Sequence, residues 1–378
     1  MVPGEFGGRT GLKKAIVVGG GPAGASAALG LLRSGFAVTL VEQRTTIGHR
    51  VCGAFLDAEA LAHLAWLGLE NQVRERAVPI HTIRVTTNRG ADHRGPLPAP
   101  GLSLPRPVLE EILLSAAEAA GGEVQRGVRV GEHRREGEGW LLDLPGLRKT
   151  VRADLLVRAD GRFSGGRLRK DGRGWYGWNA TFSKVVQSSG EMSLHFYPGG
   201  YVGIVTFADG TSNLCGLHRR TGEALDWERV FSEAWVLNKA LRFLMEGSRR
   251  ESPWAGVGPL PFSRGLSPSD GTLRAGDAAA VGDPFMGEGI GRALGAGPLI
   301  HGAIRAAGKN ADPVATYESV WRQTYGKRQR LGWVARSVLN LPRLSSRLIG
   351  TVLASPAAVG QLTRVFHGGS APNPPELN

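Results

Sequence analysis

The chain has 378 residues, of which 42% are hydrophobic, so it can bury a large core in two domains or lobes. Its net charge of +13 suits an anionic membrane or an anionic substrate. The sequence lacks zinc-ligand spacings and RNA-binding aromatic motifs, so we expect no nucleic-acid partner and no metal site. Cys52 and Cys215, the two cysteines, do not make a disulfide framework.

The first residues contain no apolar signal segment, and no uninterrupted apolar run approaches the roughly 20 residues that span a bilayer. The sequence therefore predicts a cytoplasmic protein. Residues 1–12 are polar and glycine-rich, and we expect them to be disordered.

Residues 15–42 contain the strongest local pattern. Residues 15–18 (AIVV) predict a buried parallel strand that leads into Gly19-Gly20-Gly21-Pro22-Ala23-Gly24, which contains G-x-G-x-x-G. Small residues then predict a closely packed helix, and residues 36–41 predict a second strand that ends at Glu42. This order of strand, loop, helix, strand and acid is typical of a dinucleotide-binding βαβ unit. A glycine-rich turn that binds nothing is the alternative.

Each residue of this unit has a physical role. Gly19 permits the tight turn, Gly21 lets a pyrophosphate approach the backbone, and Gly24 lets the helix lie against the strand. The helix that begins at Pro22 and Ala23 offers N–H groups and a positive dipole end to phosphates. The carboxylate of Glu42 can accept hydrogen bonds from ribose hydroxyls.

The middle of the chain alternates between helices and strands. We expect helices over residues 56–69 and 103–120, and a turn-rich segment over residues 88–101. Strands are predicted over residues 80–87, 123–130, 139–144 and 155–159. The last of these strands ends in Asp160-Gly161.

The second half has two further patterns. Repeated short strands over residues 175–217 predict an antiparallel sheet, and residues 226–245 predict a helix. Residues 307–366 are mostly helical and mix apolar residues with spaced arginines. The basic C-terminal region could contact a membrane peripherally, or its helices could simply cap the second lobe.

Three more stretches carry a resemblance. HRVCGAF (49–55), LLVRADGRFSGGR (155–167) and LRAGDAAAVGDPFMGEGIGRAL (273–294), together with GGGPAG, resemble the FAD-dependent oxidoreductases. These include the geranylgeranyl reductases and the p-hydroxybenzoate-hydroxylase-like monooxygenases. The resemblance covers roughly residues 14–305.

The resemblance implies an α/β fold with a Rossmann-like FAD-binding domain of the GR2 type, an antiparallel β-sheet substrate domain and a helical C-terminal tail. The expected FAD-binding domain is discontinuous and comprises residues 13–79, 102–168 and 268–306. The expected substrate domain comprises residues 80–101 and 169–267, and residues 307–378 form the C-terminal helical region.

The resemblance also implies roles for single residues. Asp277 accepts a hydrogen bond from the ribityl chain, and the N–H groups of Gly289 and Ile290 face one edge of the flavin ring. Arg106 reaches the phosphates, and the backbone at Val128 meets the adenine. The complete cofactor set is Gly19, Gly21, Pro22, Ala23, Gly24, Glu42, Gln43, Arg44, Arg50, Val51, Cys52, Arg106, Val128, Asp160, Gly276, Asp277, Pro284, Gly287, Gly289 and Ile290.

The substrate side is less well defined. We nominate the pocket side of the second sheet, with Trp178, His195, Tyr197, Tyr201 and Phe285. No catalytic residue is identified, and His195, Tyr201 and Cys52 are the candidates. A histidine in a strand is more often structural, and a buried inert role for Cys52 is at least as common.

The first functional prediction is an NAD(P)H-dependent monooxygenase that acts on a lipophilic or aromatic substrate. The alternative is a reductase that saturates C=C bonds of an isoprenoid, favoured by Gly-Glu-Gly at 287–289 and by Cys52. Of the Tyr-x-Trp-x-Phe-Pro stretch of geranylgeranyl reductases, however, only Tyr201 remains. The third hypothesis is a prenyl-binding protein of the same fold without enzymatic activity.

Overall fold

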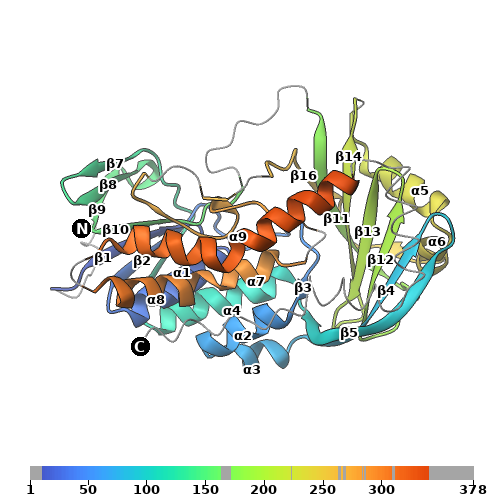
Figure 1. Cartoon of the computed structure of the whole chain (residues 1–378), viewed down its shortest axis with the longest axis horizontal. Helices are drawn as coiled ribbons and strands as arrows, with labels where there is room; N and C mark the ends of the chain where they lie inside the picture. The colour runs from blue at the N-terminus through green and yellow to red at the C-terminus, as the bar shows by residue number, and fades with distance from the viewer. Residues whose placement is uncertain are drawn as a thin grey trace.

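The structure is a computed structural model that describes residues 11–162, 172–222, 224–262, 265–266, 270–282, 284, 287–308 and 311–339, without the side chains of residues 331 and 333–339. Most of the predicted N-terminal tail, Phe285 and residues 340–378 lie outside this part of the chain. The described residues form two large sheets at opposite ends of an elongated molecule, with helices beside and between them (Figure 1).

The first large sheet is parallel, in the order β17-β10-β1-β2-β6. Its strands are β1 (Lys14–Val18), β2 (Ala37–Glu42), β6 (Glu123–Arg126), β10 (Leu155–Arg158) and β17 (Leu273–Arg274). The helices α1 (Pro22–Arg33), α4 (Arg106–Ala119) and α8 (Ala296–Ala307) cover one face. A small sheet of β7 (His133–Glu136), β8 (Gly139–Leu144) and β9 (Lys149–Ala153) packs on the other face.

Alternation along β1 explains these two layers. Ala15 and Val17 belong to the core beneath α1, whereas Ile16 packs with Trp140 and Leu142 of β8. Successive side chains of a strand point to opposite faces, so a strand covered on both sides is apolar throughout. This is why residues 15–18 contain no polar position.

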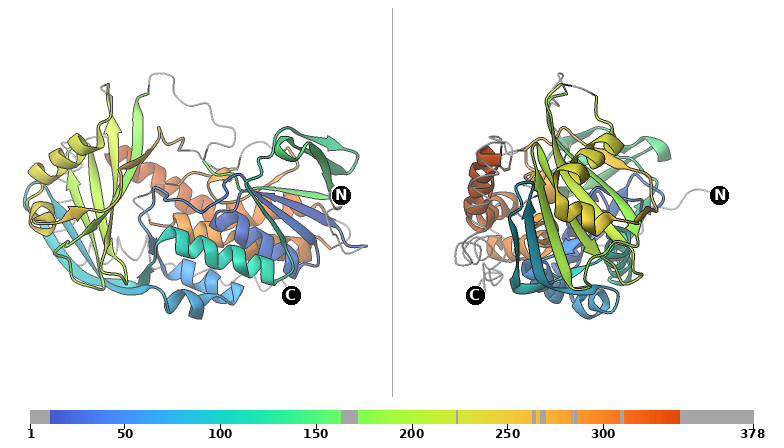
Figure 2. Two further views of the ribbon diagram at one scale, coloured as in Figure 1. Left: turned by 180° about the vertical axis from the view of Figure 1, so that it is seen from behind. Right: turned by 90° about the vertical axis from the view of Figure 1, so that its right-hand side faces the viewer.

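The second large sheet is mainly antiparallel, in the order β15-β11-β14-β13-β12-β4-β5-β3, with β12 and β4 parallel to each other. Its strands are β3 (Phe55–Leu56), β4 (Val78–Thr87), β5 (Asp92–Ser103), β11 (Gly174–Ser183), β12 (Glu191–Tyr197), β13 (Gly200–Thr206), β14 (Ser212–Arg220) and β15 (Arg249–Arg250), and β16 (Ala255–Val257) also pairs with β11. The helices α5 (Trp227–Leu237) and α6 (Lys239–Met245) cover its outer face (Figure 2).

The remaining helices lie around the parallel sheet. They are α2 (Ala58–Leu67), α3 (Glu70–Arg74), α7 (Gly289–Leu294) and α9 (Pro313–Leu339). Asp57 caps α2 by accepting a hydrogen bond from the N–H of Ala60 at 2.9 Å. The long helix α9 packs on α8 and runs across the molecule toward the second sheet (Figure 1). No helix of the described residues is long and apolar enough to cross a membrane.

This architecture confirms the predicted fold class of a Rossmann-like parallel sheet, an antiparallel sheet and C-terminal helices. Two local predictions were wrong. The segment 88–101 is not only turns, because Asp92–Ser103 forms β5 despite Pro96, Pro98 and Pro100. Pro96 pairs with Thr82 and the register resumes only at Gly101 opposite Ile80, so Pro98 and Pro100 fall in an irregularity of the β4–β5 pairing, where proline is tolerated. The helix predicted over 226–245 is also interrupted, at Asn238, whose side chain caps α6.

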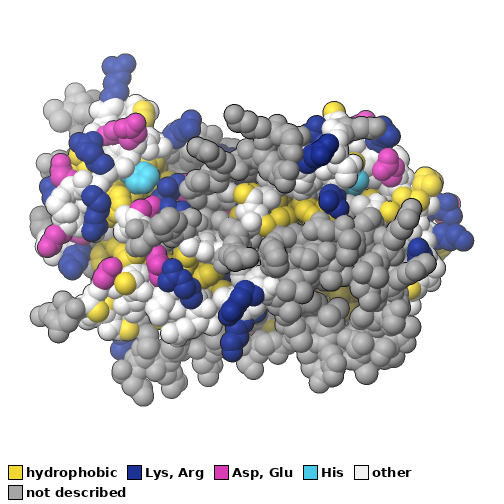
Figure 3. Space-filling view, turned by 45° about the horizontal axis from the view of Figure 1, so that its top comes forward, with side chains coloured by type: hydrophobic (Ala, Val, Ile, Leu, Met, Phe, Trp, Pro, Cys, Tyr) yellow, Lys and Arg dark blue, Asp and Glu magenta, His cyan; other side chains and the backbone are white. Residues whose placement is uncertain are grey.

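Lys and Arg side chains outnumber acidic ones on the face of the molecule that Figure 3 displays, in agreement with the net charge of +13. On this face the excess positive charge is therefore carried by exposed side chains.

Candidate functional site

One cavity of about 1020 Å³ runs from the glycine loop of the parallel sheet to the inner face of the antiparallel sheet. Its wall includes Gly21 at the beginning of α1, Gly289 at the beginning of α7 and Tyr201 of β13. Segments that are far apart in the sequence therefore form a single elongated site.

The glycine loop forms one end of this cavity. Gly19 has a φ of +105°, and a Cβ there would lie 2.4 Å from the carbonyl oxygen of Ala159. A Cβ at Gly24 would lie 1.8 Å from the carbonyl oxygen of Gly19, so only glycine lets α1 begin this close to the loop. Gly21 has no neighbour within 4 Å of its Cβ position and lines the cavity, which leaves room for a phosphate against the backbone.

Glu42 stands at the end of β2 beside this loop. Its carboxylate accepts hydrogen bonds from the N–H of Gly20 at 2.7 Å and from the N–H of Arg44 at 3.0 Å. These bonds fix an acidic group at the position where a dinucleotide fold presents one to a ribose. Val128 lines the cavity nearby, and its N–H donates to the carbonyl of Glu42.

A second glycine-rich segment meets the first from the other side. Gly276 follows β17 with a φ of +60°, and a Cβ there would lie 2.6 Å from the Cβ of Ala23. Asp277 comes next and forms ion pairs with Arg162 at 3.3 Å and Arg292 at 3.9 Å. The chain then reaches α7 through Pro284 and Gly287, which also line the cavity.

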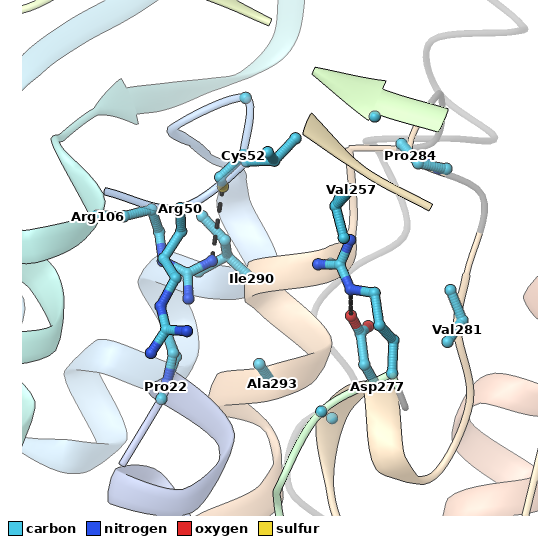
Figure 4. Close-up of a pocket in the computed structure, with 18 of the residues that line it drawn as sticks. Pro22, Arg50, Cys52, Arg106, Val257, Asp277, Val281, Pro284, Ile290 and Ala293 are labelled. Carbon is cyan, nitrogen blue, oxygen red and sulfur yellow. Dashed lines mark hydrogen bonds and ion pairs between the residues drawn. The ribbon is translucent and has the colours of Figure 1, made fainter. Parts of the chain in front are cut away.

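Arg50, Cys52 and Arg106 form one wall of the middle of the cavity, and Asp277 lies across from them (Figure 4). Nη2 of Arg106 donates to Glu110 at 2.6 Å, and Nη1 donates to the sulfur of Cys52 at 3.5 Å. Nε of Arg106 is buried and has no hydrogen-bond partner among the described residues. A guanidinium held in this way has a donor left for a ligand phosphate.

The far part of the cavity is apolar. Met192, Leu194, Tyr201, Val205 and Leu217 come from the inner face of the antiparallel sheet. Val257 and Leu260 add to this wall from the segment that follows β15. The cavity thus joins a polar, glycine-lined half to a hydrophobic half, which suits a cofactor beside a lipophilic substrate.

Three residues that we nominated for the substrate pocket lie elsewhere. Trp178, His195 and Tyr197 lie on the outer face of the antiparallel sheet, beneath α5 and α6, and none of them lines the cavity. Trp178 stacks on Trp227 with ring centroids 6.2 Å apart. Tyr201 lies on the inner face, as expected, and Phe285 falls outside the described residues.

His195 is a structural histidine. Its Nδ1 lies 2.8 Å from Oγ1 of Thr86, and its Nε2 lies 2.9 Å from Oγ of Ser193. Burial, reinforced by the charge of Arg84, lowers its pKa to about 3, so the ring is neutral at physiological pH. This arrangement corrects its nomination as a proton donor in the site.

A cluster of buried charges behind the start of α7 was not anticipated from the sequence. Glu59 of α2 accepts hydrogen bonds from Arg328 of α9 at 2.6 and 3.2 Å, and Glu288 lies 3.5 Å from the same guanidinium. Arg328, Gln329 and Gly332 of α9 line the cavity, although the sequence suggested a separate C-terminal region. A spaced arginine in a basic helix gives no sign of a buried acidic partner that lies 269 positions away in the sequence.

Every residue of the predicted cofactor set lines this cavity except Gly24, which packs behind the loop. Sequence reasoning missed Glu110, Arg158, Arg162, Glu288 and Arg292, which also line it. Contact of the predicted set with a cofactor stays a prediction.

Comparison with known proteins agrees with this geometry. Residues 13–172 match a family model described as an FAD binding domain. The chain is similar to digeranylgeranylglycerophospholipid reductase of Methanocella arvoryzae, at 28% identity, covering 82% of this chain and 83% of that protein. It is also similar to menaquinone reductase of Mycolicibacterium smegmatis, at 27% identity, covering 87% of this chain and 85% of that protein.

Solved structures share the fold. A geranylgeranyl bacteriochlorophyll reductase-like protein of Thermoplasma acidophilum has a TM-score of 0.74 at 18% identity, covering 95% of this chain and 98% of that one. HpxO of Klebsiella pneumoniae, complexed with FAD and uric acid, has a TM-score of 0.70 at 17% identity, covering 97% and 95%. The open position at Gly21, the fixed carboxylate of Glu42 and the free donor of Arg106 fit an extended FAD.

Proposed function

We propose that this chain, which belongs to the FAD-dependent oxidoreductases related to geranylgeranyl reductases, reduces C=C bonds of a lipophilic, isoprenoid-type substrate. The observation that carries the proposal is the single cavity in which the glycine-lined half continues into the apolar half. The reductase names of the relatives support it.

Different residues of the cavity would bind different parts of the cofactor and the substrate. The Gly19–Gly24 loop and Arg106 would bind the diphosphate, Glu42 the ribose, and the segment from Gly287 to Ile290 would hold the ring. Bound FAD supplies two electrons, which can pass to a carbon as hydride. Leu194, Tyr201 and Leu217 would orient the apolar substrate and exclude water from it.

Cys52 lies where the two halves of the cavity meet. Its sulfur accepts hydrogen bonds from Arg106 at 3.5 Å and from the N–H of Ala54 at 3.4 Å. Both donors fix the direction of the thiol within the wall. We propose that Cys52, held in this wall, faces the substrate side of the cofactor.

NAD(P)H is the proposed reductant. The monooxygenase hypothesis, in which NAD(P)H-reduced enzyme and O₂ hydroxylate a lipophilic or aromatic substrate, is the second candidate, because fold neighbours include the complex with FAD and uric acid. The membrane contact proposed for the basic C-terminal region would give access to an isoprenoid lipid.

Anaerobic turnover separates these candidates. The purified FAD-loaded enzyme is reduced, mixed with polyprenyl lipids and with alkyl phenols in the absence of O₂, and the products are analysed by mass spectrometry. Reoxidation of the flavin with gain of two hydrogens by a prenyl lipid is expected. Products that require O₂ and contain a new oxygen atom would replace the reductase proposal with the monooxygenase, and a protein that binds no flavin would end both.

A further inference from the structure

Three buried carboxyl groups lie together behind the first turn of α7. Asp57 and Glu59 belong to the start of α2, and Glu288 is the N-cap of α7; they are 4%, 5% and 9% exposed. A Cβ at Gly291 would lie 2.8 Å from Oδ1 of Asp57, so this carboxyl group touches α7 directly. Glu288 also lines the cavity, next to the proposed flavin-ring segment.

The negative charges of the three carboxyl groups are not equally compensated by neighbouring cations and hydrogen-bond donors. Arg328 donates two hydrogen bonds to Glu59, and the same guanidinium lies 3.5 Å from Glu288. Oε1 of Glu288 is buried without a hydrogen-bond partner among the described residues. Asp57 accepts a hydrogen bond from the N–H of Ala60. Arg292, the other arginine of this cluster, pairs with Asp277, so burying three carboxylates beside Arg328 is costly and we expect at least one of them to be neutral.

Among the described residues, the charged and titratable groups packed around this cluster come from three helices and from the segment before α7. They are Asp57, Glu59 and His63 from α2, Glu288 and Arg292 from α7, Tyr325 and Arg328 from α9, and Asp277, which pairs with Arg292. Burial opposes the ionisation of Glu59, but His63 and Arg328 lower its pKa to about 2. Burial and the neighbouring Glu59 raise the pKa of Asp57 to about 7, and burial raises the pKa of Glu288.

We propose that Asp57 and Glu288 form an acid pair that takes up a proton when the flavin is reduced and releases it when the substrate is reduced. This inference rests on the proposed function and adds a named proton source to it. The negative charge gained by the reduced flavin would be felt at Glu288, and an added negative charge favours the protonated form of a nearby carboxyl group.

The proton and electron balance is complete. With a hydride supplied to bound FAD by the nicotinamide donor, the carboxylate of the acid pair would take up one proton from solvent. During substrate reduction the π bond of the C=C group breaks and the hydride forms a C–H bond at one carbon. The carboxyl O–H bond of Glu288, the member of the pair that lines the cavity, would break and its proton would form a C–H bond at the other carbon, which returns the acid pair to its carboxylate form.

Proton uptake during anaerobic photoreduction tests the proposal without substrate. The FAD-loaded enzyme in weak buffer at about pH 8 is photoreduced while an indicator dye records protons taken up per flavin. We expect the wild type to take up about one more proton than Glu288→Gln or Asp57→Asn. Glu191→Gln is the matched control, since Glu191 is a buried, ion-paired acid outside the cavity, and it should behave as the wild type. Equal uptake by all four proteins would overturn the proposal.

A reduced-minus-oxidised infrared difference spectrum gives a second test. It uses only the wild-type protein, so its result does not depend on whether a variant folds. Gain of a carboxylic-acid C=O band on reduction is expected, and its absence would overturn the proposal. Neither measurement uses a substrate, so failure of C=C reduction would leave their outcome unchanged. Conversely, C=C reduction together with unaltered proton uptake in the variants would contradict the acid pair and leave the proposed function unaffected.

Discussion

Gly276 lies so close to Ala23 that a Cβ on the glycine would be 2.6 Å from the Cβ of the alanine. This contact joins the segment after β17 to the first turn of α1. Because of it, the glycine loop proposed to bind the diphosphate and the segment proposed to hold the ring border one cavity. The site depends on close backbone packing, and glycine is the residue that permits it.

Two glycines of the first loop should respond differently to alanine. Gly24→Ala places a methyl group 1.8 Å from the carbonyl oxygen of Gly19, so it should lower the free energy of unfolding by about 3 kcal/mol. Gly21→Ala meets nothing within 4 Å and should leave the apoprotein stable. It should weaken FAD binding roughly tenfold or more, about 1.4 kcal/mol, because the methyl group occupies the phosphate position. Thermal unfolding of the apoproteins and FAD titration measure the two effects; equal FAD affinity of Gly21→Ala and the wild type would contradict the assignment.

Arg106 and Glu110 should be coupled. Arg106→Ala removes the partner at 2.6 Å from the buried carboxylate of Glu110 and leaves only Arg50, at 4.0 Å, so we expect a loss of about 3 kcal/mol in the free energy of unfolding. The double variant Arg106→Ala/Glu110→Gln removes the poorly compensated charge and should recover part of that loss, yet still bind FAD weakly. Urea unfolding and FAD titration of the single and double variants form the cycle, and additive stability effects would argue against the ion pair.

His195 should give the protein an acid-sensitive stability. Its pKa is about 3 in the folded chain and 6.5 as a model value, so the unfolded chain binds more protons between these pH values. The free energy of unfolding should therefore fall as pH decreases from about 6.5 to about 3, by on the order of 4 kcal/mol. His195→Gln should flatten this part of the profile and leave the pH profile of catalysis unchanged. If the pH profile of catalysis lost its acidic or basic limb in His195→Gln, His195 would take part in catalysis after all.

Asp57 should make the free energy of unfolding depend on pH in the opposite direction. Its pKa is about 7 in the folded chain against a model value of 3.8, so the folded chain binds more protons between these values. The free energy of unfolding should fall as pH rises from about 4 to about 7, by on the order of 4 kcal/mol. Asp57→Asn removes this dependence while the amide can still cap α2. Chemical unfolding across this pH range, compared with Glu191→Gln, measures the effect, and an unchanged slope in Asp57→Asn would show that Asp57 is ionised throughout.

The nucleotide unit could be predicted from the sequence because its signals are local. The turn at Gly19, the close approach at Gly24 and the acid at Glu42 follow from residue types at fixed spacings. The same holds for Gly276 and Asp277, whose position after a short strand is visible in the sequence. Local backbone chemistry is thus sufficient to find both glycine-rich segments of the polar half of the cavity.

The substrate side could not be predicted in the same way. Alternation shows that Leu194 and His195 point to opposite faces of β12, but the sequence does not show which face borders the cavity. The aromatic residues Trp178 and Tyr197 instead form the core beneath α5 and α6. The ion pair between Glu59 and Arg328 was hidden for a related reason, because it depends on where α9 packs.

The structure of the FAD-loaded protein tests the central claim most directly. The account predicts one extended FAD, with its diphosphate at the Gly19–Gly24 loop, its ring beside Gly289 and the free face of the ring toward Tyr201. A flavin that lies outside this cavity, or whose ring lies away from the start of α7, would contradict it.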